Sequence, residues 1–94
     1  ARETGGSYLT VADEKILAAV ADLGRFGVFS EPAAAAAYAG YLQALRTGKL
    51  GDEDPVLVLS TGSGLKDVDA VRRIVPEPPV IEPTVGAVKR LLKR

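Results

Sequence analysis

The loop Thr61–Gly64, of sequence Thr-Gly-Ser-Gly, holds the residues whose types and spacing are best suited to chemistry. Its hydroxyl groups can donate or accept hydrogen bonds, and its glycines allow a sharp turn and the close approach of a ligand. The loop follows the apolar run Val56–Leu59 and precedes Asp67, a residue type that often caps a helix. Because ligands of open α/β sheets bind beyond the carboxyl ends of the strands, the pattern predicts a ligand site at this loop. A simple turn between a strand and a helix is the alternative interpretation.

The composition excludes several kinds of site from the chain. It contains no cysteine and no histidine, so it can form no disulfide, thiolate metal site, Ser-His-Asp triad or Cys-His pair. The loop is not a Walker phosphate-binding loop, because Lys66 and Asp67 stand where a Lys-Ser/Thr pair and a longer spacing are needed. Acidic and basic residues balance at 12 each, so the net charge does not indicate nucleic acid or membrane as a partner.

The length of 94 residues suits one small domain. No apolar run reaches the length of a membrane span and no secretory signal is present, so we expect a cytoplasmic protein. The chain begins without methionine, and only two segments have the pattern of strands. Because a two-stranded sheet is only marginally stable by itself, we expect the chain to be a piece of a larger protein.

Two short strands are predicted, at Tyr8–Val11 and Val56–Leu59. The second is apolar at every position, which indicates a strand that is buried on both faces. Caps and apolar spacing place the helices: the first opens at Asp13 and ends at Gly24, the second opens at Glu31-Pro32 and ends at Thr47-Gly48, the third runs from Asp67 to Val75, and the last starts at Glu82-Pro83-Thr84. The sequence therefore predicts an α/β architecture of two short strands with three to four helices.

The second predicted helix has a face of small residues, formed by Ala33, Ala37, Gly40 and Ala44. Helix propensity explains the alanines, but a glycine inside a helix lowers its stability by about 1 kcal/mol relative to alanine. We therefore expect a neighbouring backbone or sheet to pack closely on this face.

Three segments resemble motifs of one enzyme family. Residues 11–16 read V-A-D-E-K-I and resemble V-[ST]-D-E-E-I. Residues 27–36 read G-V-F-S-E-P-A-A-A-A and resemble G-[IV]-F-x-E-P-A-[SA]-A-A, while residues 60–67 read S-T-G-S-G-L-K-D and resemble T-G-x-G-L-K-D. In this order and spacing they resemble the C-terminal part of threonine synthases, which are pyridoxal-phosphate enzymes of the tryptophan-synthase-β-like fold. Ala12 departs from the pattern, because the family usually has a Ser or Thr cap there.

The resemblance implies that residues 1–75 are the C-terminal segment of a catalytic domain, and that residues 76–94 are a proline-rich link and a basic C-terminal helix. It implies the conversion of O-phosphohomoserine and water to threonine and phosphate, with pyridoxal 5'-phosphate as cofactor. The implied partners are the remainder of the enzyme chain and a second copy of the enzyme in a homodimer. A threonine or serine dehydratase of the same superfamily and a non-catalytic interaction module are the alternatives.

The resemblance also assigns site residues by position. Thr61 matches the hydroxyl residue that contacts the pyridine nitrogen of the cofactor, and Gly62, Ser63 and Gly64 match the turn that brings it there. Glu31 matches a carboxylate near the cofactor ring, although an acid at this point also suits the start of the second helix. No metal ligand is implied.

The lysine that binds the cofactor covalently in this family lies far upstream, in an S-F-K-D-R-like motif. None of the five lysines of this chain has that context. The family's asparagine loop under the cofactor ring and its phosphate-binding loop are also missing from these 94 residues. The resemblance therefore implies that this chain alone is inactive and carries one wall of a site.

Overall fold

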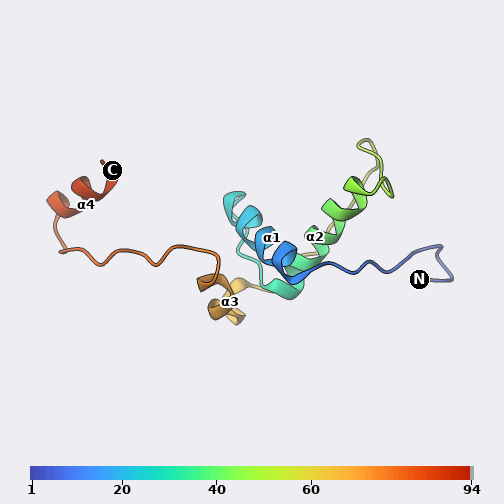
Figure 1. The fold of residues 1–94 in the computed structure, drawn as a ribbon, viewed down its shortest axis with the longest axis horizontal. Helices are drawn as coiled ribbons and strands as arrows, with labels where there is room; N and C mark the ends of the chain where they lie inside the picture. Colours follow the sequence, from blue (N-terminus) through green and yellow to red (C-terminus); the bar gives the residue numbers. More distant parts are fainter. Residues whose placement is uncertain (94) are drawn as a thin grey trace.

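The computed structural model describes residues 1–93, and over this range all regular secondary structure is helical. The elements are α1 (Asp13–Arg25), α2 (Pro32–Arg46), the short 3-10 helix η1 (Gly64–Lys66), α3 (Val68–Arg72) and α4 (Val85–Leu92). Figure 1 shows α1 and α2 packed together, with α3 beside them and α4 at the end of an extended segment. The four predicted helices are therefore confirmed, with changes at some of their ends.

A small core lies between α1 and α2. Its buried residues are Ala19, Val20, Ala35 and Ala39. Half-buried apolar side chains surround this core, and they include Ile16 and Leu23 from α1, Val71 from α3 and Ile74 from the turn that follows it. Alanines at the contact let the two helices approach closely, but their small side chains bury little apolar surface and therefore contribute little hydrophobic stabilisation.

The helix ends follow local side-chain chemistry. Asp67 accepts a hydrogen bond from the backbone N–H of Ala70 over 3.1 Å, and so caps α3 as predicted. Helix α3 ends at Arg72 rather than at the predicted Val75, and the hydrogen bonds that follow, from Arg73 to Ala70 and from Ile74 to Val71, have the i to i−3 spacing of a tighter turn. Helix α1 continues past Gly24, and the turn that follows it uses Gly27, whose φ is 82°.

Helix α4 begins after Thr84, whose hydroxyl accepts a hydrogen bond from the N–H of Ala87 over 3.2 Å. Lys89 and Arg90 lie in its last turn, where positive charge complements the helix dipole.

The two predicted strands do not form within residues 1–93, so the two-strand part of the α/β prediction is not confirmed. Within this range neither Tyr8–Val11 nor Val56–Leu59 makes a backbone–backbone hydrogen bond to another segment, although the carbonyl of Thr10 accepts one from the side chain of Gln43 over 2.9 Å. The expected double-sided burial of the second segment is wrong for this structure, because Leu57 is 85% exposed and Leu59 is 67% exposed. The physical reason is that a strand needs a neighbouring strand to pair with, and the described residues place none beside either segment.

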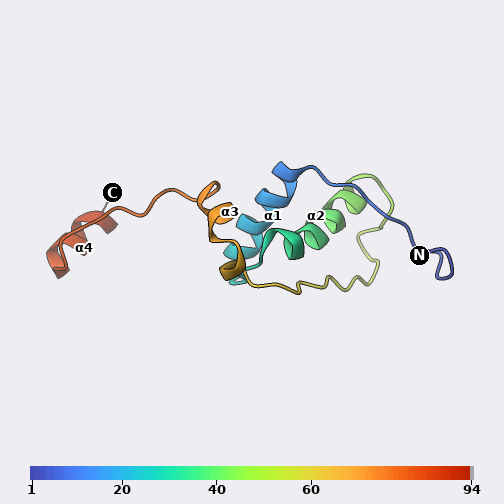
Figure 2. The ribbon, with the colours of Figure 1, turned by 90° about the horizontal axis from the view of Figure 1, so that it is seen from below.

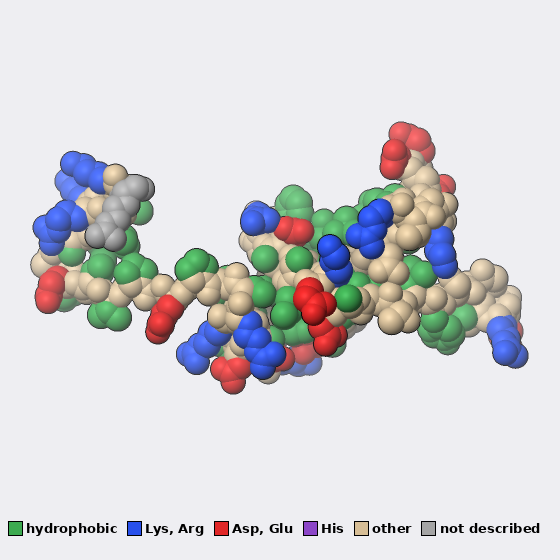
Figure 3. Space-filling model, viewed as in Figure 1, with side chains coloured by type: hydrophobic (Ala, Val, Ile, Leu, Met, Phe, Trp, Pro, Cys, Tyr) green, Lys and Arg blue, Asp and Glu red, His purple; other side chains and the backbone are tan. Residues whose placement is uncertain are grey.

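The molecule is elongated, with extents of 60 × 27 × 19 Å and a radius of gyration of 17.6 Å. A compact domain of this length has a radius of gyration of about 12 Å. Figures 1 and 2 show the cause, which is the extended link that carries α4 away from the helix pair. Figure 3 shows hydrophobic side chains on the surface of this link, where Val80 is fully exposed. None of the helices described in residues 1–93 has both the length and the apolar character needed to cross a membrane.

Candidate functional site

The predicted loop lies directly against the segment that precedes α2. The backbone N–H of Glu31 donates to the carbonyl of Gly62 over 3.0 Å, and the N–H of Gly64 donates to the carbonyl of Phe29 over 2.9 Å. Together these bonds form an isolated antiparallel bridge, the one β-type pairing found in residues 1–93. The bridge brings two of the three family-like segments together, although they are some thirty residues apart in the sequence.

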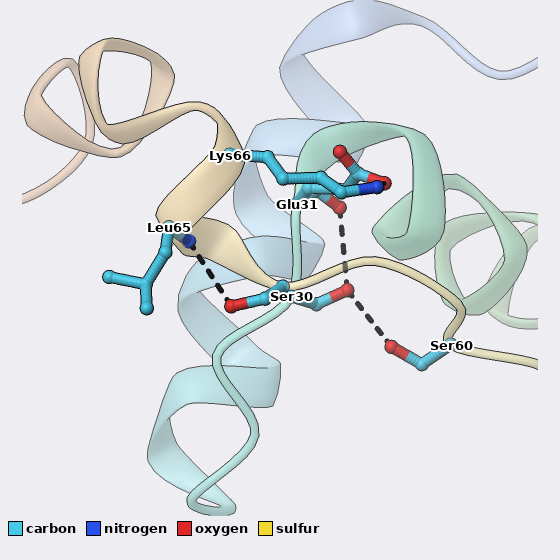
Figure 4. Close-up of polar contacts among 6 residues, drawn as sticks. Ser30, Glu31, Ser60, Leu65 and Lys66 are labelled. Atoms are coloured by element: carbon cyan, nitrogen blue, oxygen red, sulfur yellow. Dashed lines mark hydrogen bonds and ion pairs between the residues drawn. The ribbon is translucent and has the colours of Figure 1, made fainter.

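A pair of serines supports the bridge from one side. The side chain of Ser30 is completely buried, and its hydroxyl lies 3.0 Å from the hydroxyl of Ser60 (Figure 4). Ser30 also donates to the carbonyl of Glu31 over 3.3 Å, which leaves Ser60 to donate to Ser30. Sequence reasoning did not single out either serine as a site residue, although both lie within or at the edge of the segments that resemble family motifs.

Glu31 places its carboxylate against the loop. A β-carbon added at Gly62 would overlap the carboxylate of Glu31, so this position has room only for glycine while Glu31 stays in place. The Nζ atom of Lys66 lies 3.7 Å from Oε1 of Glu31 (Figure 4). The Glu31 side chain is 19% exposed and that of Lys66 is 67% exposed, so water weakens the ion pair.

The alternative role of Glu31, at the start of the second helix, is only partly present. Glu31 is the N-cap residue of α2 by backbone position, but its side chain accepts no capping hydrogen bond. Its carboxylate is directed at the loop instead, with Lys66 as its partner. In the structure Glu31 therefore lies beside the loop. The family resemblance implied this proximity, whereas the spacing of the residues in the sequence does not predict it.

The far end of the loop is fixed by packing and by a local cap. Gly64 is buried, and a β-carbon added there would overlap the ring of Phe29. The hydroxyl of Ser63 accepts a hydrogen bond from the N–H of Leu65 over 3.3 Å and so caps η1. Ser63 thus already has a structural partner, and its glycine neighbours allow the close approach of Phe29 and Glu31.

Thr61 lies at the exposed part of the loop. Its hydroxyl makes no hydrogen bond to any of the residues that the structure describes, in contrast to the hydroxyls of Ser30, Ser60 and Ser63. The residues on either side of Thr61 are fixed by hydrogen bonds, whereas its own hydroxyl is exposed and makes no hydrogen bond within residues 1–93. Such a group can donate or accept one hydrogen bond from a ligand without adding a charge near neutral pH.

The family of pyridoxal-phosphate dependent enzymes matches residues 1–62, which is well over half of the 94-residue chain. The chain belongs to this family. The match includes the segment that precedes α2 and reaches Gly62, so it covers most of the bridge described above. Pyridoxal phosphate is the cofactor from which the family takes its name.

Almost the entire chain is similar in sequence to part of several threonine synthases. The enzyme of Methanosarcina acetivorans is 38% identical over 92 residues, which are 97% of this chain and 23% of the relative. The threonine synthase of Methanocaldococcus jannaschii is 40% identical, over 96% of this chain and 22% of the relative. That of Mycobacterium tuberculosis is 39% identical, over 96% and 26%. The chain thus spans about a quarter of the length of these relatives, and the predicted resemblance is confirmed.

The residues of the loop fit one edge of such a cofactor. The pyridine nitrogen of pyridoxal phosphate takes part in one hydrogen bond, and the hydroxyl of Thr61 has the right chemistry and no competing partner among residues 1–93. The Glu31 carboxylate occupies the space that a side chain at position 62 would take, so a carboxylate lies directly beside Thr61. A cofactor-binding role for Thr61, Gly62, Ser63 and Glu31 stays a prediction.

Proposed function

We propose that this chain forms one wall of the cofactor site in a threonine-synthase-like enzyme, which converts O-phosphohomoserine and water to threonine and phosphate. The observation that carries this proposal is the 38% and 40% identity to the threonine synthases of Methanosarcina acetivorans and Methanocaldococcus jannaschii over nearly all of the chain. The alternative function is that of a threonine or serine dehydratase. These enzymes belong to the same superfamily, but they release ammonia rather than phosphate from their substrate.

The proposed role of the loop is to bind and orient the cofactor ring. The hydrogen bond from Glu31 to Gly62 fixes the backbone beside Thr61, which lowers the conformational entropy that the loop loses when a ligand binds. When bound, pyridoxal phosphate supplies the electron sink for the reaction. Thr61 supplies a neutral hydrogen bond to the ring nitrogen, whereas a carboxylate at the same point would hold a proton there.

Glu31 is proposed to lie near the ring, with its charge balanced by Lys66. The carboxylate lies against Gly62, the residue next to Thr61, and the ammonium group is 3.7 Å away. Lys66 compensates the negative charge of Glu31, so the loop as a whole presents little net charge to the cofactor. This arrangement suits the neutral contact proposed for Thr61.

Covalent attachment of the cofactor is assigned to a lysine outside this chain, because none of the five lysines here lies in the expected motif. We expect the 94-residue chain, incubated with pyridoxal phosphate and borohydride, to gain no reduced cofactor at a specific lysine by mass spectrometry. A single lysine modified in full yield would contradict this assignment.

The reaction is tested in the full-length enzyme that carries this sequence. Purified enzyme is mixed with O-phosphohomoserine, and both phosphate and threonine are measured over time. Equal amounts of the two products support the proposal. Formation of a 2-oxo acid and ammonia from threonine or serine, without turnover of O-phosphohomoserine, would assign a dehydratase, and the absence of any turnover would favour a non-catalytic module.

The proposal includes the remainder of the enzyme chain as the immediate partner and a homodimer as the assembly. It also includes a cytoplasmic location and the division of the chain into residues 1–75 and 76–94. Sedimentation of the full-length enzyme tests the homodimer, and a monomer at micromolar concentration would contradict it.

A further inference from the structure

The hydroxyls of Ser30 and Ser60 form a polar contact that the proposed function does not use. Ser30 is completely buried, and its Oγ atom lies 3.0 Å from the Oγ atom of Ser60. Ser30 also donates to the carbonyl of Glu31 over 3.3 Å (Figure 4). Because Ser30 gives its one proton to that carbonyl, the contact has a direction, with Ser60 as the donor and Ser30 as the acceptor.

This contact acts directly beside the exposed hydroxyl of the loop, because Ser60 is the residue before Thr61. On the other side of Thr61, the carbonyl of Gly62 accepts a hydrogen bond from the N–H of Glu31 over 3.0 Å. Thr61 is therefore flanked by two hydrogen bonds, one through the side chain of Ser60 and one through the backbone of Gly62. Their partners are Ser30 and Glu31, two consecutive residues that lead into α2.

The bond at Gly62 alone does not determine where the Thr61 hydroxyl points. It fixes one end of Thr61, whereas the other end can rotate about the backbone dihedrals of residues 60 and 61 unless Ser60 is also held. Residues 56–59 make no backbone hydrogen bond within residues 1–93. Among the described residues, the contact with Ser30 is therefore the nearest hydrogen bond on the N-terminal side of Thr61.

Hydroxyl groups at this point favour a directing role over a stabilising one. A hydrogen bond between neutral groups adds little net stability, because the same groups bond to water in the unfolded chain. Its geometry is strict, however, since it weakens steeply as the angle at the hydrogen bends. Two apolar side chains would fill the same space without fixing a direction. The buried hydroxyl of Ser30 therefore restricts the orientation of Ser60.

We propose that Ser60, held by Ser30, is a positioning residue that directs the hydroxyl of Thr61 toward the ring nitrogen of the cofactor. The inference rests on the proposed function, in which Thr61 contacts that nitrogen. The effect of Ser60 on the cofactor passes through Thr61 and not through a contact of its own. The loss of cofactor affinity on removing the Ser60 hydroxyl is therefore no larger than the loss on removing the hydroxyl of Thr61.

The test is a double-mutant cycle in the full-length enzyme, whose cofactor-free form is titrated with pyridoxal phosphate. Ser60→Ala should weaken cofactor binding about threefold, and by no more than Thr61→Val does. In the Thr61→Val background, Ser60→Ala should have no further effect, because no hydroxyl is left to direct. An equal weakening in both backgrounds would overturn the proposal. So would a silent Ser60→Ala in an enzyme that Thr61→Val does weaken.

The absorbance spectrum of the bound cofactor separates positioning from a general loss of stability. Ser60→Ala should shift the absorbance maximum in the same direction as Thr61→Val, because both variants weaken the same hydrogen bond to the ring. Ser30→Ala removes the other half of the contact and should cause the same shift. Lower melting temperatures of the two serine variants without any spectral shift would assign them a purely structural role and overturn the proposal.

Thr47→Val is the matched control. The hydroxyl of Thr47 donates to the carbonyl of Gln43 over 2.8 Å at the opposite end of α2, so this variant also loses a hydroxyl hydrogen bond. It should change neither the affinity for the cofactor nor the spectrum. A shift as large as that of Ser60→Ala would show that the loss of a remote hydroxyl disturbs the site equally, which would overturn the proposal.

These outcomes are distinct from those of the reaction itself. An enzyme that forms threonine and phosphate but shows no coupling between Ser60 and Thr61 would overturn the inference and leave the proposed function in place. Coupling in an enzyme that does not turn over O-phosphohomoserine would support the positioning role and contradict the proposed reaction. A silent Thr61→Val would overturn both the cofactor contact of Thr61 and the inference that depends on it.

Discussion

Residues 56–59 and 60–64 are neighbours in the sequence but differ in how they are held. The second stretch is fixed to the segment before α2 by two backbone hydrogen bonds and by the contact between Ser60 and Ser30. The first makes no backbone hydrogen bond within residues 1–93 and exposes Leu57 and Leu59. The change occurs within a few residues, where the loop reaches the start of α2.

The difference lies in where each stretch finds its partners. The loop needs only two backbone groups and a few close contacts, and a nearby turn of the same chain supplies them. A strand needs a full row of donors and acceptors, which another strand must supply. The loop is therefore held in place within residues 1–93, although no sheet forms there.

The largest effect is expected from a change that releases the loop. Gly64→Ala places a methyl group into the ring of Phe29, and Gly64 is buried. Such overpacking costs about 1–3 kcal/mol, and here it acts on the hydrogen bond from Gly64 to Phe29. Amide exchange at Gly64 and Glu31 in the 94-residue chain measures the loss.

The Phe29→Ala background separates overpacking from other causes. With the ring removed, Gly64→Ala should cost much less than it does beside Phe29, because the methyl group has room. Equal losses in the two backgrounds would show that the ring does not limit position 64. Equal losses would also contradict the inference that close packing against Phe29 holds the loop in place.

The next effect concerns the residue that the loop presents. In the full-length enzyme, Thr61→Val should weaken cofactor binding by tenfold or less and lower turnover, because one neutral hydrogen bond contributes about 0.5–1.5 kcal/mol. Thr61→Asp should instead favour a proton on the ring nitrogen, shift the absorbance spectrum of the bound cofactor and increase side products. Titration with the cofactor and product analysis check both variants, and a silent Thr61→Val would mean that the residue only ends a segment.

The helices were predictable because their signals are local. Asp67 and Thr84 cap the helices that their side-chain types predicted. Ile16, Val20 and Leu23 recur in the sequence at helical spacing, and they form the contact face of α1. Helix α1 runs one residue past Gly24, since the positive φ that ends the turn falls at Gly27. Local patterns place an element more surely than they place its last residue.

The strands and the serine pair depend on distant partners, and so the sequence says less about them. Val56–Leu59 has the composition of a buried strand, but burial needs neighbours that residues 1–93 do not place beside it. Ser30 and Ser60 are 30 residues apart in the sequence, and no periodic pattern of residues predicts the contact between them. The resemblance to threonine synthases implied that Thr61 and Glu31 belong to one site, and that role stays a prediction. The structure adds that the Glu31 carboxylate lies against Gly62, the residue next to Thr61.

A smaller effect is expected at the buried serine. Ser30→Ala removes the hydroxyl that contacts Ser60 and leaves no polar atom buried in its place. Ser60 is exposed and can turn to water, so the loss should be about 0.5–1 kcal/mol. Exchange at the Glu31 and Gly64 amides should rise by up to about fivefold, clearly less than in Gly64→Ala. A rise as large as that of Gly64→Ala would make the serine contact the main support of the loop.

The smallest effect is expected at the ion pair. Lys66→Gln removes a charge that is 67% exposed and 3.7 Å from the carboxylate of Glu31. Exposed pairs of this kind contribute about 0.2–1 kcal/mol, and the long separation favours the lower end. Glu31 should keep its place against Gly62, because α2 and the bridge fix its backbone.

The rate of amide exchange at Gly64 should therefore change by about twofold or less in Lys66→Gln. Added salt screens exposed charges, and it should have a similarly small effect on the exchange rate in the unmodified chain. Exchange that accelerates strongly in both experiments would contradict this account. It would mean that charge, rather than the bridge and the packing of Phe29 on Gly64, separates the held loop from the unpaired stretch before it.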